Sequence, residues 1–213
     1  YASHWSTYPL MMAFAFDDEP AVVIDRDNGE PVPKIVVEAL RDPSVVIPAW
    51  NAPFERRILR ECMGYDLPPE RFRCSMALAH TLSLPGALDK VEEILGLDED
   101  QAKIKDGKRL IQKFCKPRKP SKHKKWTRNN RDTDPEDWEK FLEYCRRDVE
   151  SERSLRRRMG KFDMPAHEWA NWCLDQRIND RGLPISRVHA ENALEIADTE
   201  KRRLIKRAKD LSG

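Results

Sequence analysis

The sequence predicts an α/β domain, a mixed sheet flanked by helices, with a helical C-terminal extension. Two apolar runs near the start predict strands: Pro9 to Phe16, which ends at an Asp-Asp-Glu-Pro turn, and Ala21 to Asp25, which is rich in β-branched residues. A third observation predicts the helices, because most later apolar residues recur at helical spacing. The first two runs are short and close together, so we expect them to form a hairpin.

Strand and helix then alternate once more. Lys34 to Arg41 carries apolar residues at helical spacing, and Ser44 to Pro48 has the composition of a short buried strand. A helix should follow from about Pro53 to Cys62, because proline is favoured in the first turn of a helix. Its predicted inner stripe consists of Phe54, Ile58, Leu59 and Cys62.

The remaining chain is predicted to be helical. Helices are expected at about 73–81, 88–95 and 107–114, followed by a surface loop over 116–134 that is rich in proline and lysine. Asp134 and Pro135 are typical of a helix start, and the inner face of this long helix should comprise Trp138, Phe141, Leu142, Cys145, Val149 and Leu155. Two more helices are expected at about 166–180 and 186–211.

Composition limits the possible classes of protein. A chain of 213 residues is long enough for a hydrophobic core without disulfides, and its five cysteines lack the paired spacing of a zinc or redox site. Its 39 basic and 37 acidic residues nearly cancel, so the net charge of +2 says little about partners. The start has no leader-like pattern and no apolar run is long enough to span a bilayer, so we expect a soluble, cytoplasmic protein of a bacterial or phage-infected cell, without a membrane partner. The sequence lacks an initiator methionine, so we expect the chain to be a piece of a longer protein.

A Tyr-x-x-x-Asp motif lies inside the long helix. Tyr144 and Asp148 are one turn apart and therefore share a helix face, where a carboxylate can hold a metal ion while a phenol orients water. Hydrolysis of a phosphodiester requires such groups, because two hard cations about 4 Å apart activate the water and stabilise the leaving oxygen. The structural alternative is a core-facing Tyr144 and an Asp148 that pairs with Arg147 or Arg153.

A second motif, Asn51-Ala-Pro-Phe-Glu55, stands directly after a predicted strand, where a helix N-terminus is open to an anion. In the structural alternative Asn51 belongs to the N-cap region, Phe54 belongs to the core, and Glu55 complements the helix dipole. Together the two motifs predict a metal-dependent nuclease more specifically than either does alone.

Taken over nearly its whole length, the chain resembles the 3′–5′ proofreading exonuclease domain of phage-type family A DNA polymerases, which belongs to the DEDDy branch of the RNase H-like superfamily. The residues that carry the resemblance are Trp50 to Arg56, Leu84 to Lys90 with Gly107 to Ile111, Tyr144 to Glu150, and Cys173 to Pro184. The last segment resembles the junction that precedes the polymerase domain.

The resemblance implies roles for specific residues. Glu55 and Asp148 would be ligands of Mg²⁺ or Mn²⁺, Tyr144 would position the nucleophilic water, and Asn51 and Phe54 would contact the 3′-terminal nucleotide of single-stranded DNA. One departure is glutamate at position 55, where better-known bacterial members carry aspartate.

A larger departure concerns the first exonuclease motif, an Asp-x-Glu on the opening strand. The segment Asp17-Asp18-Glu19 matches the Asp-x-Glu pattern but falls at the turn between two predicted strands. We therefore interpret these residues as turn residues. An RNase H-like sheet has three strands before its first helix, whereas this sequence offers two. We therefore expect the first strand and its carboxylates to lie upstream of Tyr1, and this chain to bind DNA but to cleave it slowly or not at all.

A basic block extends from Lys103 to Arg131 with Asp106 as its one acidic residue. It is either a solvated loop or a strap that grips the phosphate backbone, and the strap would use Lys122, Lys124, Lys125 and a stacking Trp126.

The resulting prediction is an exonuclease-like domain over 1–160 and a helical extension over 161–213 that leads to an absent polymerase domain. The alternative function is a non-catalytic nucleic-acid-binding or structural module of a polymerase or replication complex, which the missing first motif favours. An unrelated helical scaffold would explain neither motif.

Overall fold

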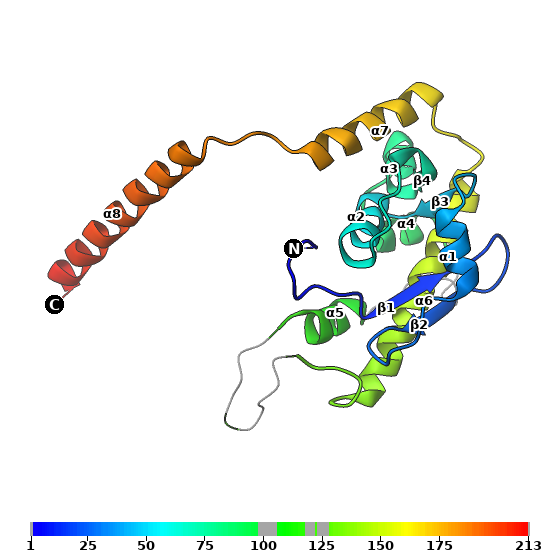
Figure 1. The fold of residues 1–213 in the computed structure, drawn as a ribbon, viewed down its shortest axis with the longest axis horizontal. Helices are drawn as coiled ribbons and strands as arrows, with labels where there is room; N and C mark the ends of the chain where they lie inside the picture. Colours follow the sequence, from blue (N-terminus) through cyan, green and yellow to red (C-terminus); the bar gives the residue numbers. More distant parts are fainter. Residues whose placement is uncertain (1, 98–105, 118–121, 123–127, 213) are drawn as a thin grey trace. The chain divides into compact units, whose positions relative to one another are not determined.

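The computed structural model describes residues 2–97, 106–117, 122 and 128–212. The chain divides into two compact units, Tyr1–Leu174 and Asp175–Gly213, and the division falls inside a helix. The first unit contains strands and helices, as the α/β prediction requires, and the second is helical (Figure 1). The predicted functional division at residue 160 stays a prediction.

The predicted hairpin is present. Strand β1 (Met11–Phe14) pairs antiparallel with β2 (Val22–Asp25), with Met11 opposite Asp25 and Phe14 opposite Val22. The turn between them holds Asp17 in the left-handed region, at φ 40°. Asp17, Asp18 and Glu19 are all exposed in this turn, which confirms their interpretation as turn residues.

A second strand pair follows helix α1 (Lys34–Arg41), which buries Val36 and Leu40. Strand β3 (Ile47–Ala49) pairs in parallel with β4 (Phe72–Cys74), which comes after a 3₁₀ turn, η1 (Pro69–Arg71). Residues 73 and 74 were predicted to begin a helix, and that prediction is wrong. Three residues are too few to show strand periodicity, so the pairing with β3 decides their conformation.

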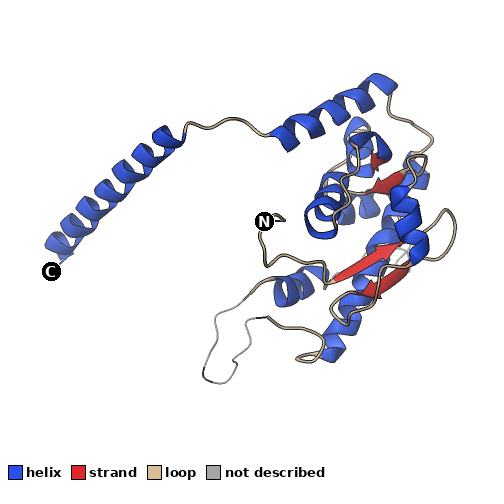
Figure 2. Cartoon of the chain, in the orientation of Figure 1, coloured by secondary structure: helices blue, strands red, loops and turns tan. Residues whose placement is uncertain are grey.

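Within the residues that the structure describes, the strands form two separate two-stranded sheets rather than the single mixed sheet that was predicted (Figure 2). No described strand lies between β1 and β3 to join them. The register and direction of each pair are therefore set independently.

Helix α2 (Ala52–Met63) begins and ends where predicted, with Gly64 in the left-handed conformation at its C-terminus. Its inner face differs from the prediction, because the buried residues are Ala52, Arg56 and Leu59. Phe54 is 47% exposed, so it belongs neither to the predicted stripe nor to the core. The apolar pattern of the sequence assigned Phe54 to the buried face of the helix. In the structure, the face that packs against the rest of the unit is the one that carries Ala52 and Arg56.

The middle helices agree with the sequence: α3 (Ser75–Thr81), α4 (Leu88–Leu95) and α5 (Gly107–Cys115). The long helix α6 (Pro135–Met159) starts at the predicted proline and packs along β1, β2 and α3–α5 (Figure 1). Of its predicted inner face, Trp138, Phe141 and Leu155 are buried and the other residues are half-buried. Helix α6 therefore supports the hairpin and the helical middle at once.

The last two helices are α7 (Ala166–Arg181) and α8 (Arg187–Ser212). In the first unit, Trp169 and Trp172 of α7 pack edge to face with ring centroids 6.0 Å apart, against the core around β3 and β4. In the second unit, α8 has no buried residue. None of the helices in the described ranges is both long and apolar enough to cross a bilayer.

Candidate functional site

Glu55 stands in the first turn of α2, directly after β3. The turn is closed by a hydrogen bond of 2.8 Å from the Phe54 backbone amide to the Asn51 carbonyl oxygen. The Oε2 atom of Glu55 is closed to solvent and has no hydrogen-bond partner. Burial is the main cause that raises the pKa of Glu55 to about 7; repulsion from Glu152 and Asp148 contributes to this shift, and a hydrogen bond from its own backbone amide opposes it.

Asp148 reaches the same place from α6. It is half-buried, its Oδ1 atom is closed to solvent, and its charge repels that of Glu55. Cys145 is close to both acids and to Ala13 of β1. Burial is the main cause that raises its pKa to about 12, the charges of Asp148 and Glu55 contribute to the shift, and a hydrogen bond from the Ala13 backbone opposes it. The two sequence motifs therefore meet beside β1.

The other strand pair borders this place as well. Burial raises the pKa of the Cys74 thiol on β4, and the negative charge of Glu55 contributes to the same shift. Glu55 is thus near enough to interact with Cys145 on the β1 side and with Cys74 on the β4 side. Glu55 is accordingly close to both strand pairs.

Glu152 is a third acid that the sequence interpretation missed. It is only 7% exposed, and its Oε1 atom accepts a hydrogen bond from the Ser75 hydroxyl and lies 3.5 Å from Arg156 Nε. Burial raises its pKa, while Ser75 and the nearby arginines lower it. Its position one turn after Asp148 was the available signal, because residues four apart share a helix face. We call Glu55, Asp148 and Glu152 the buried carboxylate cluster.

Tyr144, predicted to position water, is 5% exposed and belongs to an aromatic core. Its ring stacks on Phe141 at a centroid distance of 6.1 Å, and Gly107 approaches so closely that an added Cβ would lie 1.9 Å from the ring. This environment agrees with the core-facing alternative. The role of Tyr144 in positioning water stays a prediction.

Asn51 and Phe54, predicted to contact a nucleotide, are both exposed at the start of α2. Asn51 occupies the N-cap position, but its side chain makes no capping hydrogen bond. The structural alternative is therefore correct about the position of Asn51 and wrong about Phe54 as a core residue. Both side chains remain accessible to a ligand that approaches Glu55.

The predicted basic strap is only partly described. Lys124, Lys125 and Trp126 lie outside the described residues, and Lys122 is exposed. Closer to α5, the acids Asp106, Asp134 and Asp137 pair with two of the cations, Arg109 and Lys113.

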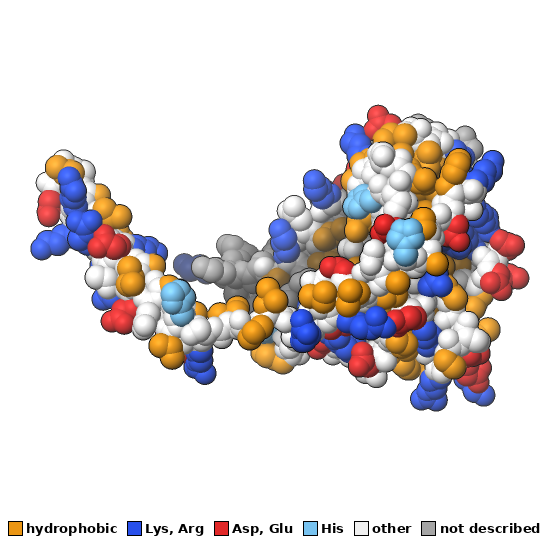
Figure 3. All heavy atoms as spheres, turned by 90° about the horizontal axis from the view of Figure 1, so that it is seen from above, with side chains coloured by type: hydrophobic (Ala, Val, Ile, Leu, Met, Phe, Trp, Pro, Cys, Tyr) orange, Lys and Arg blue, Asp and Glu red, His pale blue; other side chains and the backbone are white. Residues whose placement is uncertain are grey.

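We call these five residues the ion-pair cluster. Hydrogen bonds from Arg109 and Lys113 hold the pKa of Asp137 well below its usual range. Part of the positive charge is therefore neutralised within the protein. Figure 3 likewise shows basic and acidic side chains interspersed over the visible face.

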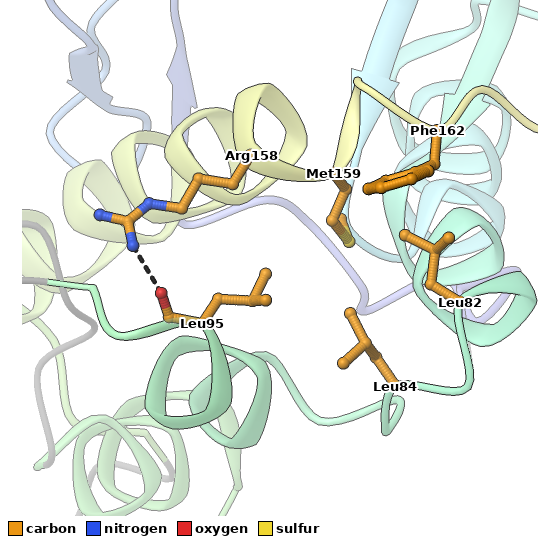
Figure 4. Close-up of a pocket in the computed structure, with 6 residues that line it drawn as sticks. All are labelled: Leu82, Leu84, Leu95, Arg158, Met159 and Phe162. Carbon is orange, nitrogen blue, oxygen red and sulfur yellow. Dashed lines mark hydrogen bonds between the residues drawn. The ribbon is translucent and has the colours of Figure 1, made fainter.

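A pocket of about 280 Å³ lies elsewhere in the first unit (Figure 4). Its lining is mainly apolar, and its one charged residue, Arg158, donates hydrogen bonds to the carbonyl oxygens of Leu95 and Gly96. None of the buried carboxylate cluster lines it. The pocket is therefore separate from the candidate site.

The donor set suits a divalent cation only in part. The buried, unsatisfied Oε2 of Glu55 and the nearby Asp148 are the hard oxygen ligands that Mg²⁺ and Mn²⁺ prefer. However, no group of three or more His, Cys, Asp or Glu side chains in the described part of the chain is arranged to hold a metal ion. Glu55 and Asp148 as metal ligands therefore stay a prediction.

Comparison with known proteins shows similarity to a phage DNA polymerase. A DNA polymerase of Bacillus phage SP02 is 41% identical to it over 205 residues. The match covers 96% of this chain and 31% of that polymerase, so the chain spans about a third of the length of its relative. No family model matches the chain, and no solved structure does. The match supports a polymerase-derived domain.

Proposed function

We propose that this chain is the 3′–5′ exonuclease domain of a family A DNA polymerase, with an RNase H-like fold, and that it acts on phosphodiester bonds at DNA 3′ ends. The observation that carries the proposal is the meeting of Glu55 and Asp148, which belong to two motifs far apart in the sequence. The similarity to a phage DNA polymerase supports it. Proofreading would be the role of such a domain in the longer protein.

Each residue has a defined part in this proposal. Glu55 and Asp148 bind Mg²⁺ or Mn²⁺, whose chemistry is to activate water and to stabilise the leaving oxygen. Asn51 and Phe54, exposed beside Glu55, hold the terminal nucleotide. Tyr144 lies one turn before Asp148 on α6, and its packed ring fixes the direction of its hydroxyl.

In this proposal the site also needs ligands that the described part of the chain does not supply. We propose that a further strand, carrying an Asp-x-Glu motif, lies between β1 and β3 and completes both the sheet and the metal site. Two features support this: the described strands form two separate pairs, and Glu55 is close enough to interact with Cys145 beside β1 and with Cys74 on β4. The chain alone therefore binds DNA and cleaves it slowly or not at all.

The test is degradation of an end-labelled single-stranded oligonucleotide with Mg²⁺ or Mn²⁺. The chain is compared with Asp148→Ala and with a control, Glu139→Ala, which removes an exposed carboxylate from the same helix. We expect any cleavage to disappear with Asp148→Ala and to survive Glu139→Ala. Full cleavage by Asp148→Ala would overturn the assignment of the metal ligand.

A polypeptide extended to include the preceding part of the longer protein tests the missing strand. We expect this extension to raise cleavage strongly, and Asp148→Ala to abolish the gain. Full activity of the 213-residue chain with Mg²⁺ would contradict the proposal that ligands are missing.

The second candidate is a non-catalytic nucleic-acid-binding module. The lack of a three-residue metal group within the described ranges favours it. Such a module has no cleavage to lose, so an extended polypeptide that binds DNA but never degrades it would support this candidate over the exonuclease.

A further inference from the structure

Trp5 is the most exposed large apolar side chain in the described part of the chain, at 91% of its surface. The neighbouring ring of His4 lies with its centroid 5.6 Å away at an interplanar angle of 32°. An indole that stays in water contributes no burial free energy to folding. Packing within this unit therefore does not explain why a tryptophan stands at position 5. Most of the indole surface is available to a ligand.

Tyr8 presents a second aromatic surface on the same segment and is 46% exposed. The guanidinium of Arg128 lies 5.4 Å from the Tyr8 ring centroid, and its Nη2 donates a hydrogen bond of 3.2 Å to the Ser6 carbonyl oxygen. The Tyr8 hydroxyl donates to Asp27 Oδ1 at 3.2 Å. The segment is thereby attached to two distant parts of the chain, through the Tyr8 side chain and the Ser6 backbone.

Charge accompanies these rings. No carboxylate within the described ranges forms an ion pair with Arg128. Arg109 and Lys113 differ in this respect, because both form ion pairs with acids of the ion-pair cluster. Arg128 is half-buried, and Lys122 is an exposed cation in the same stretch of sequence. The positive charge at Arg128 is therefore available to an anion.

We propose that His4, Trp5, Tyr8 and Arg128 form a binding surface for single-stranded nucleic acid, with bases stacked on the rings and a phosphate paired with Arg128. We call it the aromatic–arginine surface. Aromatic rings next to cations are the usual means of binding single strands, because every base offers a π face and every nucleotide a negative charge. The proposal rests on the proposed function for its substrate, and it adds a binding surface that neither exonuclease motif contains.

The composition of the segment favours nucleic acid over a protein partner. Ser6 and Thr7 separate Tyr8 from the adjacent His4 and Trp5, so the three rings form no continuous apolar face. Protein interfaces have a buried apolar centre, whereas base stacking needs only separate rings. Arg128 also provides the charge that a phosphate requires.

Binding of a fluorescein-labelled dT12 oligonucleotide, measured by anisotropy in EDTA, tests the surface without any cleavage. We expect Trp5→Ala to weaken binding about five- to tenfold, because stacking of a base on an aromatic ring contributes on the order of 1 kcal/mol or more. Trp5→Phe should retain most of the affinity and Trp5→Leu should lose it, since only phenylalanine keeps a π face. The control Phe162→Ala removes another exposed ring, 63% exposed, and should leave binding unchanged.

Arg128→Gln tests the phosphate contact. We expect the slope of log affinity against log salt concentration to fall by about 0.7, the value for one phosphate on a single strand. An unchanged slope, or Trp5→Leu binding as well as the parent chain, would overturn the proposal. Thermal unfolding of each variant shows whether the fold is intact.

The two proposals fail in different ways. If the exonuclease assignment is wrong, no variant cleaves, yet Trp5→Ala still weakens binding in EDTA. If the aromatic–arginine surface is wrong, Trp5→Ala binds normally, yet Asp148→Ala still removes the cleavage of the extended polypeptide.

Discussion

The buried carboxylate cluster and the ion-pair cluster both involve acids of α6, but they differ in how charge is compensated. In the ion-pair cluster, Arg109 and Lys113 lie within 2.6 Å of Asp137 and lower its pKa. In the buried carboxylate cluster, burial and mutual repulsion raise the pKa of Glu55 to about 7. Oppositely charged side chains that pair compensate each other, so they cost the folded state little free energy. Carboxylates that are buried close together destabilise the folded state, and such groups are typical of functional sites.

The largest expected effect concerns activity. In the extended polypeptide, Asp148→Ala should reduce cleavage by about a hundredfold or more, because removal of a metal ligand affects the transition state directly. Asp137→Ala in the ion-pair cluster should leave the cleavage rate per folded molecule within about twofold. Equal losses in both variants, measured as initial rates, would abolish the distinction between the clusters.

Glu55→Gln should stabilise the metal-free protein at high pH. The folded pKa of Glu55 is raised, so the folded state holds its proton more tightly than the unfolded state between the ordinary pKa of 4.5 and about 7. Stability is therefore lost as the pH rises through that window, by up to about 3 kcal/mol.

Urea unfolding in EDTA at pH 5 and pH 8 measures this difference. Glu55→Gln should match the parent at pH 5 and exceed it by about 1–3 kcal/mol at pH 8. Glu139→Gln, on an exposed acid, is the control. A destabilising effect of Glu55→Gln at pH 8 would show that its carboxylate is compensated.

Ser75→Ala should destabilise the protein by about 1–3 kcal/mol, because it leaves the buried carboxylate of Glu152 without its hydroxyl donor. In the background of Glu152→Gln the same change should cost less, since a neutral amide needs less compensation. A double-mutant cycle of unfolding free energies measures the coupling between the two side chains. Strictly additive effects would separate Ser75 from the cluster.

Asp137→Asn should have the smallest effect, a fall in melting temperature of roughly 1–3 °C at neutral pH. The folded pKa of Asp137 is lowered, so its contribution is present above the ordinary pKa of 3.8 and is lost as the pH falls below it. The effect should also shrink in 1 M NaCl, because salt screens exposed ion pairs. A melting temperature that drops equally in high salt would point to packing rather than charge.

Part of the candidate site follows from sequence spacing alone. The motifs at Asn51–Glu55 and Tyr144–Asp148 predicted two acids from separate helices, and the structure brings those acids together. Glu152 was missed because its burial and its bond to Ser75 depend on how α6 packs against α3. The pairing of Arg109 and Lys113 with Asp134 and Asp137 was missed for the same reason, since the partners are more than twenty residues apart.

The sequence by itself determined the hairpin, the order of the helices and most helix limits. Local signals suffice for these, such as Pro135 at the start of α6 and Gly64 after α2, because capping and turn preferences act within a few residues. Only the tertiary structure decided that residues 72–74 form a strand, that Phe54 faces outward, and that Tyr144 is packed in an aromatic core. Each of these depends on contacts between distant segments, and free energies of burial and pairing override the local pattern.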